Sequence, residues 1–132
     1  MRPIVSEVVL DASAFMALLN SEPGGEMVAE AIPEAAISAV NFSEVVAKLA
    51  ESRGADEEAI RRVLQDFPFD IVPFDAEQAY EAGFLRPATR NLGLSLGDRA
   101  CVGLARRSGA PVLTADQRWS WLSVGVDVTE IR

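Results

Sequence analysis

The strongest constraint on the fold is an alternation, along the whole chain, between short apolar runs and segments with helical spacing. Strands are predicted over Ile4–Leu10, Ala35–Ser38, Ile71–Phe74, Pro111–Thr114 and Val124–Ile131. Helices are predicted over Ala12–Leu19, Glu26–Ala31, Val40–Ser52, Asp56–Phe67, Ala76–Leu85 and Ser95–Arg107, with a short helical turn after Asp116. This alternation favours an α/β fold in which helices cover both faces of a mostly parallel sheet.

Prolines and glycines refine these boundaries. Pro73 places the strand Ile71–Phe74 at an edge of the sheet, because a proline cannot donate a ladder hydrogen bond. Pro87 is expected to interrupt the helix that begins at Ala76. The chain has 132 residues and shows no internal repeat, so we expect a single domain over residues 1–132 with a core of its own.

The absence of one residue type excludes many mechanisms. The chain contains no histidine and one cysteine, so Ser-His-Asp and Cys-His systems and Cys/His zinc sites are excluded. A lone cysteine forms no intrachain disulfide, which is typical of a reducing compartment. Without a secretory segment or a long apolar run, we expect a cytoplasmic protein with no membrane partner.

Four acidic residues stand at positions that the predicted fold would bring together. Asp11 and Asp116 follow the first and fourth predicted strands, while Glu44 and Asp98 lie near the starts of helices. Ligands of open parallel sheets bind at the carboxyl ends of the strands. Helix capping is the competing interpretation, because aspartate is a favoured first residue and because Asn41–Glu44 and Ser95–Asp98 are both spaced like capping boxes.

Carboxylates in one pocket repel one another. Two of them about 4 Å apart repel by roughly 4 kcal/mol at an effective dielectric constant near 20. Shared protons or a cation must offset that cost, and oxygen ligands without histidine or cysteine favour Mg²⁺, with Mn²⁺ as an alternative. Such an ion can activate a bound water and stabilise charge on a phosphate.

Three stretches of the sequence together resemble the PIN domain, and in particular the VapC-like toxins of bacterial type II toxin–antitoxin pairs. The first is VVLDASAFMALL, with Asp11 and Ser13, and the second is SAVNFSEVVAKL, with Glu44. The third is LSLGDRACVGLARRSGAPVLTAD, with Asp98, Thr114 and Asp116. Each fragment alone is a weak signal, whereas all of them in this order are specific.

The resemblance implies a three-layer α/β/α fold of four to five strands and a Mg²⁺-dependent endoribonuclease. It also implies that Asp11, Glu44 and Asp98 form the metal and catalytic site and that Asp116 completes it, directly or through water. Ser13 and Thr114 would orient the carboxylates with their hydroxyls. The implied partners are an RNA substrate, a cognate antitoxin and a second copy of the chain.

One departure from the family pattern concerns the residues after the fourth acid. Many relatives carry a further acid there, whereas Gln117 and Arg118 follow Asp116 in this chain. A site with one metal ion and a site with two both remain open.

The net charge of −8 argues against broad affinity for RNA. Eleven of the twelve basic residues are nevertheless arginines, whose planar fork suits phosphate. The ones that flank the acids in sequence are Arg86, Arg90, Arg99 and Arg118. We expect them to form a local rim for RNA phosphates, the alternative being a solvated, salt-bridged surface.

Two alternative functions come from different classes of protein. A phosphoacceptor receiver domain has a similar length and an acidic Mg²⁺ pocket, but it needs paired acids after the first strand and a late lysine. Here only Asp11 ends that strand, and the single lysine, Lys48, lies within a helix. A catalytically silent PIN fold that acts as a binding or regulatory module is the second alternative. The presence of all four acids weakens it.

Overall fold

The sheet of the computed structural model is parallel throughout. The structure describes residues 6–132, apart from the side chains of Arg53, Ser120 and Trp121, so Ile4 and Val5 of the first predicted strand lie outside it. The strands are β1 (Val8–Leu10), β2 (Ala35–Ser38), β3 (Asp70–Val72), β4 (Val112–Thr114) and β5 (Val128–Glu130). Their order is β3–β2–β1–β4–β5, and each neighbouring pair is parallel. The predicted sheet is thus confirmed, and β3 lies at an edge.

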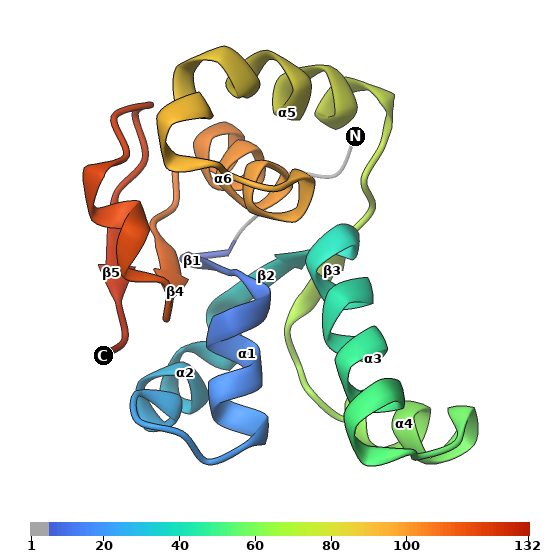
Figure 1. Cartoon of the computed structure of the whole chain (residues 1–132). Helices are drawn as coiled ribbons and strands as arrows, with labels where there is room; N and C mark the ends of the chain where they lie inside the picture. Colours follow the sequence, from blue (N-terminus) through green and yellow to red (C-terminus); the bar gives the residue numbers. More distant parts are fainter. Residues whose placement is uncertain (1–5) are drawn as a thin grey trace.

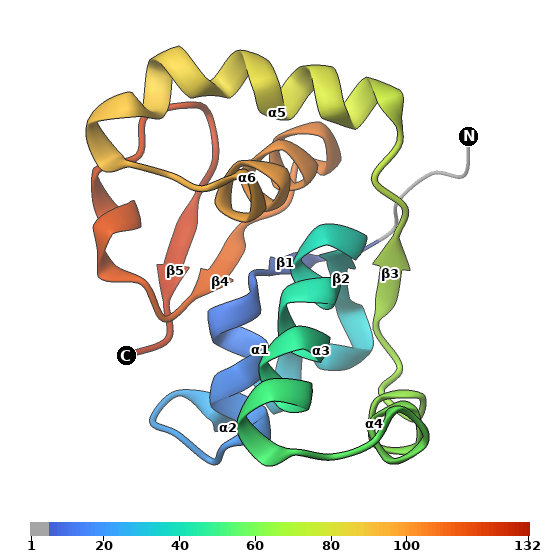
Figure 2. The ribbon, with the colours of Figure 1, turned by 45° about the vertical axis from the view of Figure 1, so that its right-hand side comes forward.

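Helices form a layer on each face of this sheet (Figures 1 and 2). One layer contains α1 (Ala12–Leu19), α2 (Gly25–Ala31), α3 (Ala39–Arg53) and α4 (Glu57–Leu64). The other contains α5 (Ala76–Thr89) and α6 (Leu96–Ser108). Short 3₁₀ segments are η1 (Ile32–Glu34), η2 (Arg90–Leu92) and η3 (Gln117–Trp121). The arrangement is the predicted three-layer α/β/α fold.

The sheet separates two apolar cores because successive residues of a strand point to opposite faces. Leu10 and Leu113 pack with α1 and the helices beside it, in a core that also holds Phe15. Val9 and Val112 pack on the other face against α6 and the buried Trp119. The two cores fix the sheet between its helices and so fix the carboxyl ends of β1 and β4.

Pro87 does not interrupt α5, contrary to the expectation. The helix continues through it to Thr89, whose hydroxyl donates to the carbonyl of Leu85 at 2.8 Å. A proline in a helix interior costs about 3 kcal/mol. Packing of α5 against α6, through the buried Leu85 among others, outweighs that cost. The prediction that the helix stops near Leu85 was therefore wrong.

Two other predicted elements are shorter in the structure. The helix expected to reach Phe67 ends at Leu64, because Phe67 turns into the core, where its ring lies 5.0 Å from that of Phe15. The strand expected over residues 124–131 is confined to Val128–Glu130. In the described part of the chain, no helix is both long enough and apolar enough to cross a membrane.

Candidate active site

The candidate acids gather at the carboxyl edge of the sheet, where β1 and β4 lie side by side. Asp11 follows β1, Asp116 comes two residues after β4, and Glu44 and Asp98 lie on α3 and α6. Cys101 lies one turn beyond Asp98 on α6 and is buried. Its thiol pKa is raised by burial and also by the charges of three carboxylates, which belong to Asp11, Asp98 and Glu44.

Asp11 is the most deeply placed of the four acids, with 4% of its surface exposed. Its Oδ1 accepts from the backbone N–H of Ala14 at 2.8 Å, which caps α1. The hydroxyl of Thr114 donates to its Oδ2 at 2.6 Å, and the hydroxyl of Ser13 lies 2.8 and 2.9 Å from its two oxygens. Burial raises the pKa of Asp11 to about 6, although these hydrogen bonds oppose the shift. The structure therefore places the hydroxyls of Ser13 and Thr114 on a desolvated carboxylate.

The hydroxyls of Ser13 and Thr114 also join the start of α1 to the end of β4. The backbone N–H of Ala115 donates to Ser13 Oγ at 2.9 Å, and that of Asp116 donates to Thr114 Oγ1 at 2.9 Å. A short network thus fixes Asp11 relative to the backbone of Asp116.

Glu44 is held by two residues that the sequence reasoning missed. The side-chain amide of Asn41 donates to Glu44 Oε1 at 3.0 Å and to the carbonyl oxygen of Gly97 at 2.9 Å, so it links α3 to α6. The carboxylate lies against Gly97, where a Cβ would be 2.5 Å from both carboxylate oxygens. A glycine in the first turn of a helix and the three-residue spacing of Asn41 and Glu44 were the available signals.

Asp98 belongs both to a helix start and to the acid cluster. Its Oδ2 accepts from the backbone N–H of Ser95 at 3.0 Å, while Ser95 Oγ accepts from the backbone N–H of Asp98 at 3.2 Å. This reciprocal pair is a capping box. The side chain is 22% exposed, so Asp98 lies nearer the surface than Asp11.

Asp116 is engaged by the arginine two residues after it. Arg118 Nε lies 3.0 Å from both oxygens of Asp116, and Nη2 lies 2.5 Å from Oδ2. The guanidinium lowers the pKa of Asp116 and its own pKa is raised in turn. Arg118 Nη2 is also 3.6 Å from Asp98 Oδ2, so one guanidinium connects two of the candidate acids.

Capping and clustering prove compatible, because a carboxylate has two oxygens. Asp11, Asp98 and Asp116 each accept a backbone N–H at a helix start. The capping-box interpretation of Asn41 and Glu44 was wrong, since Ser38 caps α3 and places Asn41 inside the helix. The Asn41–Glu44 pair instead serves the contact between α3 and α6.

The donor chemistry of the cluster fits a hard divalent cation. It offers carboxylate oxygens, together with the buried Asn41 Oδ1, which has no hydrogen-bond partner in the described structure. Between residues 6 and 132, no three acidic or sulfur side chains lie close enough to hold one ion without moving. Coordination would therefore require side-chain rotation, and Asp116 is the acid most committed to another partner, Arg118.

The predicted arginine rim is split between two environments. Arg86 on α5 and Arg90 on η2 are exposed. Arg99 is half-buried, and its Nη1 donates to the carbonyl oxygen of Ala82 on α5 at 3.0 Å. A phosphate contact by Arg99 stays a prediction. Trp119 and Cys101 are buried in the core.

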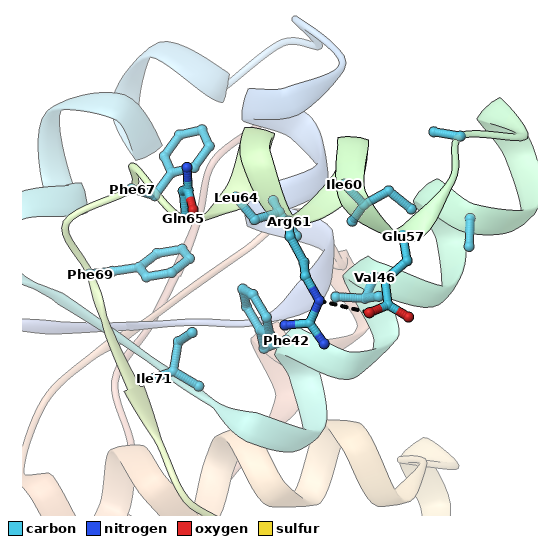
Figure 3. A pocket seen from close by; sticks show the side chains of 12 residues that line it. Phe42, Val46, Glu57, Ile60, Arg61, Leu64, Gln65, Phe67, Phe69 and Ile71 are labelled. Atoms are coloured by element: carbon cyan, nitrogen blue, oxygen red, sulfur yellow. Dashed lines mark hydrogen bonds and ion pairs between the residues drawn. The ribbon is translucent and has the colours of Figure 1, made fainter.

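A separate apolar groove of about 800 Å³ lies between α3, α4 and β3 (Figure 3). Its lining includes Phe42 and Val46 from α3 and Ile60 from α4. An ion pair between Arg61 Nε and Glu57 Oε2, 3.0 Å long, borders it. None of the four candidate acids lines this groove, so it is a different surface from the acid cluster.

The fold and the acidic edge of the sheet define the class of protein. The PIN domain family model matches residues 8–123, and the chain belongs to that family. It is 29% identical over 115 residues to VapC ribonuclease Mb2780c of Mycobacterium bovis and to ribonuclease VapC42 of Mycobacterium tuberculosis. Each of these matches covers 80% of this chain and 88% of the relative.

Solved structures of other proteins share the fold. The DNA-bound VapBC structure from Salmonella typhimurium superposes with a TM-score of 0.74 at 17% identity, covering 96% of this chain and 99% of that one. FitAcB from Neisseria gonorrhoeae gives a TM-score of 0.73 at 19% identity, covering 94% and 97%. At these identities the likeness establishes the architecture alone.

Proposed function

We propose that this chain is a Mg²⁺-dependent endoribonuclease that acts as the toxin of a toxin–antitoxin pair. The observation that carries the proposal is a set of contacts at the switch point between β1 and β4. Asp11 accepts a hydrogen bond from Thr114, Glu44 packs against Gly97 beside Asp98, and Arg118 lies between Asp98 and Asp116. A chain without histidine leaves oxygen-bound metal as the economical source of a nucleophile. Similarity to ribonucleases of the VapC type supports RNA as the substrate class.

In this proposal, Asp11, Glu44 and Asp98 hold the ion and Asp116 completes the site. A divalent cation bound there would lower the pKa of a bound water and neutralise charge on the scissile phosphate. Ser13 and Thr114 keep Asp11 in one orientation through short hydrogen bonds. Asn41 and Gly97 position Glu44 in a comparable way. The amide of Asn41 donates a hydrogen bond to the carboxylate, and Gly97 has no side chain that would occupy the place of that carboxylate.

The phosphate backbone of RNA would be contacted by few cations. Arg86 and Arg90 are exposed and lie on the segments that lead into α6. Their guanidinium groups can donate two hydrogen bonds to one phosphate. A small number of such contacts on an acidic protein would keep non-specific affinity low.

Cleavage of mixed cellular RNA with Mg²⁺ and with EDTA tests the proposal, using the wild type, Asp98→Asn and Ser95→Ala. Asp98→Asn is expected to lose activity. Ser95→Ala weakens the same helix start by about 1 kcal/mol but keeps the carboxylate, so it should retain activity. Unchanged cleavage by Asp98→Asn would refute the assigned site. No cleavage by any protein across diverse RNAs would favour the silent binding module.

We further propose that the groove between α3 and α4 receives an apolar segment of the antitoxin. Its apolar lining is only partly covered, as for Phe42 and Val46, and the structures that share the fold include a toxin–antitoxin complex from Klebsiella pneumoniae. The probe is the product of a small open reading frame directly upstream, co-expressed with the toxin. Val46→Asp should abolish co-purification, whereas Val63→Asp on the exposed side of α4 should not. Equal co-purification by both variants would exclude this groove.

The proposed homodimer has a candidate surface on α5. Tyr80 and Phe84 are 64% and 77% exposed, and their rings stack with centroids 6.2 Å apart. Exposed aromatic pairs are typical of interfaces. Light scattering should give a dimer for the wild type and a monomer for Phe84→Arg, with Val63→Arg as the control for added surface charge. A monomeric wild type would refute the homodimer.

A further inference from the structure

Arg118 holds an unusual position for a residue at the mouth of an acidic cluster. Its guanidinium contacts both oxygens of Asp116, lies 3.6 Å from Asp98 Oδ2 and donates to the carbonyl oxygen of Leu92 at 3.4 Å. Asp116 immediately precedes η3, which carries Arg118 itself, whereas Asp98 lies on α6 and Leu92 on η2. The Arg118 side chain therefore connects the start of its own 3₁₀ turn to two other segments.

This placement gives two of the acids a counterion from within the chain. Side chains of Asp116 and Asp98 are 24% and 22% exposed, so their charges are partly desolvated and their repulsion is only partly screened. The planar fork of arginine satisfies one carboxylate with parallel hydrogen bonds while it approaches another. Arg118 thus supplies the positive charge that an ion at the same carboxylates would supply.

The guanidinium and a metal ion would compete for these oxygens. Arg118 contacts both oxygens of Asp116. A divalent cation at Asp116 and Asp98 would place two cations within a few ångströms, and their repulsion would favour release of the guanidinium. The arginine side chain is 54% exposed, so it can move into solvent when it is released.

We propose that Arg118 is a built-in counter-cation, which competes with the divalent ion for Asp116 and Asp98 and is displaced when the ion binds. The inference rests on the proposed metal site. According to this proposal, Arg118 stabilises the charged carboxylates of Asp116 and Asp98 in the metal-free protein, and it lowers the affinity of the site for a metal ion. Once displaced, the guanidinium is available at the mouth of the site for an RNA phosphate.

Metal affinity without RNA provides the first test, with Mn²⁺ as the probe and electron paramagnetic resonance as the readout. Arg118→Gln should bind Mn²⁺ about tenfold more tightly than the wild type, since one nearby positive charge is removed. Arg62→Gln is the matched control, because it removes the same charge from an exposed pair on α4, and it should bind within twofold of the wild type. Equal or weaker binding by Arg118→Gln would overturn the competition.

Displacement itself is visible by NMR in the wild type. The Nε–H resonance of Arg118, assigned by its loss in Arg118→Gln, should move toward the position of a free guanidinium as Mg²⁺ is added. A resonance that stays fixed while Mg²⁺ saturates other signals of the site would refute displacement and leave the metal site intact. If no variant binds Mn²⁺ at all, the metal site fails, and the competition fails with it.

Discussion

Glu44 and Gly97 are in contact across two helices, with the carboxylate of one filling the space that a side chain on the other would need. A Cβ on Gly97 would lie 2.5 Å from each carboxylate oxygen of Glu44. That distance is far inside van der Waals contact, so the carboxylate must leave its place if Gly97 gains a side chain. The position of the Glu44 carboxylate thus requires a glycine at position 97, whereas the conformation of α6 does not.

Gly97→Ala should displace Glu44 and reduce ribonuclease activity at least tenfold while the protein stays folded. The obstructing group is the end of a flexible side chain, so rotation can relieve the clash. Gly103→Ala is a matched control on α6, because its Cβ would meet Leu85 at an ordinary 3.9 Å. Measuring activity and melting temperature together separates displacement of Glu44 from a general loss of stability. Full activity in Gly97→Ala would show that the placement of Glu44 is unimportant.

Thr114→Val should destabilise the protein by about 2 kcal/mol, because it removes a short hydrogen bond to a buried carboxylate at nearly constant volume. The pKa of Asp11 should rise further, since that hydroxyl opposes the effect of burial. Thr114→Ser keeps the hydroxyl and should lose much less stability. Urea unfolding measures both free energies. Similar losses for the two variants would show that the hydroxyl contributes no more stability than the methyl group does.

The stability contributed by Asp11 should fall as the pH rises. Burial raises the pKa of Asp11 from 3.8 to about 6, so within that window the folded chain keeps a proton that the unfolded chain releases. The protein therefore loses ~3 kcal/mol of unfolding free energy from this group between about pH 4 and pH 6. Asp11→Asn cannot titrate there. Subtracting its stability curve from that of the wild type, in EDTA, should reveal the loss, and a constant difference would contradict it.

RNA binding should depend only weakly on salt. Few arginines are available, and the net charge of −8 repels phosphate elsewhere on the surface. Binding of single-stranded RNA to Asp98→Asn, which should bind without cutting, is expected to give a log K against log salt slope shallower than about −5. A steeper slope would indicate an extended basic surface that the exposed Arg86 and Arg90 do not account for.

The topology and the neighbourhood of the acids were predictable from the sequence, because both follow from local patterns. Apolar runs that end at Asp11 or before Asp116 indicate parallel strands and the edge at which they finish. Glu44 lies at that edge because α3 follows β2 directly, and Asp98 lies there although α6 follows η2 and not a strand. These predictions need only the spacing of residues and the rule for parallel sheets.

Contacts between distant segments were not predictable. Pro87 sits in a helix because α5 packs on α6, which local propensity does not record. Asn41 and Glu44 look like a capping box, although the strand before them ends at Ser38, which takes the cap itself. The attachment of Arg99 to Ala82 depends on how two helices cross. Each case was decided by tertiary packing, which a single sequence does not specify.

The hydrogen bond from Thr114 to Asp11 joins residues that are 103 positions apart in the chain. Synthesis proceeds from the N-terminus, so Asp11 and Glu44 leave the ribosome long before β4 exists. Throughout that interval the nascent chain lacks β4, which pairs with β1, and the hydroxyl of Thr114, which orients the carboxylate of Asp11. The same long-range pairing makes folding late and cooperative. A cell making this protein therefore handles an incomplete site until β4 has been synthesised.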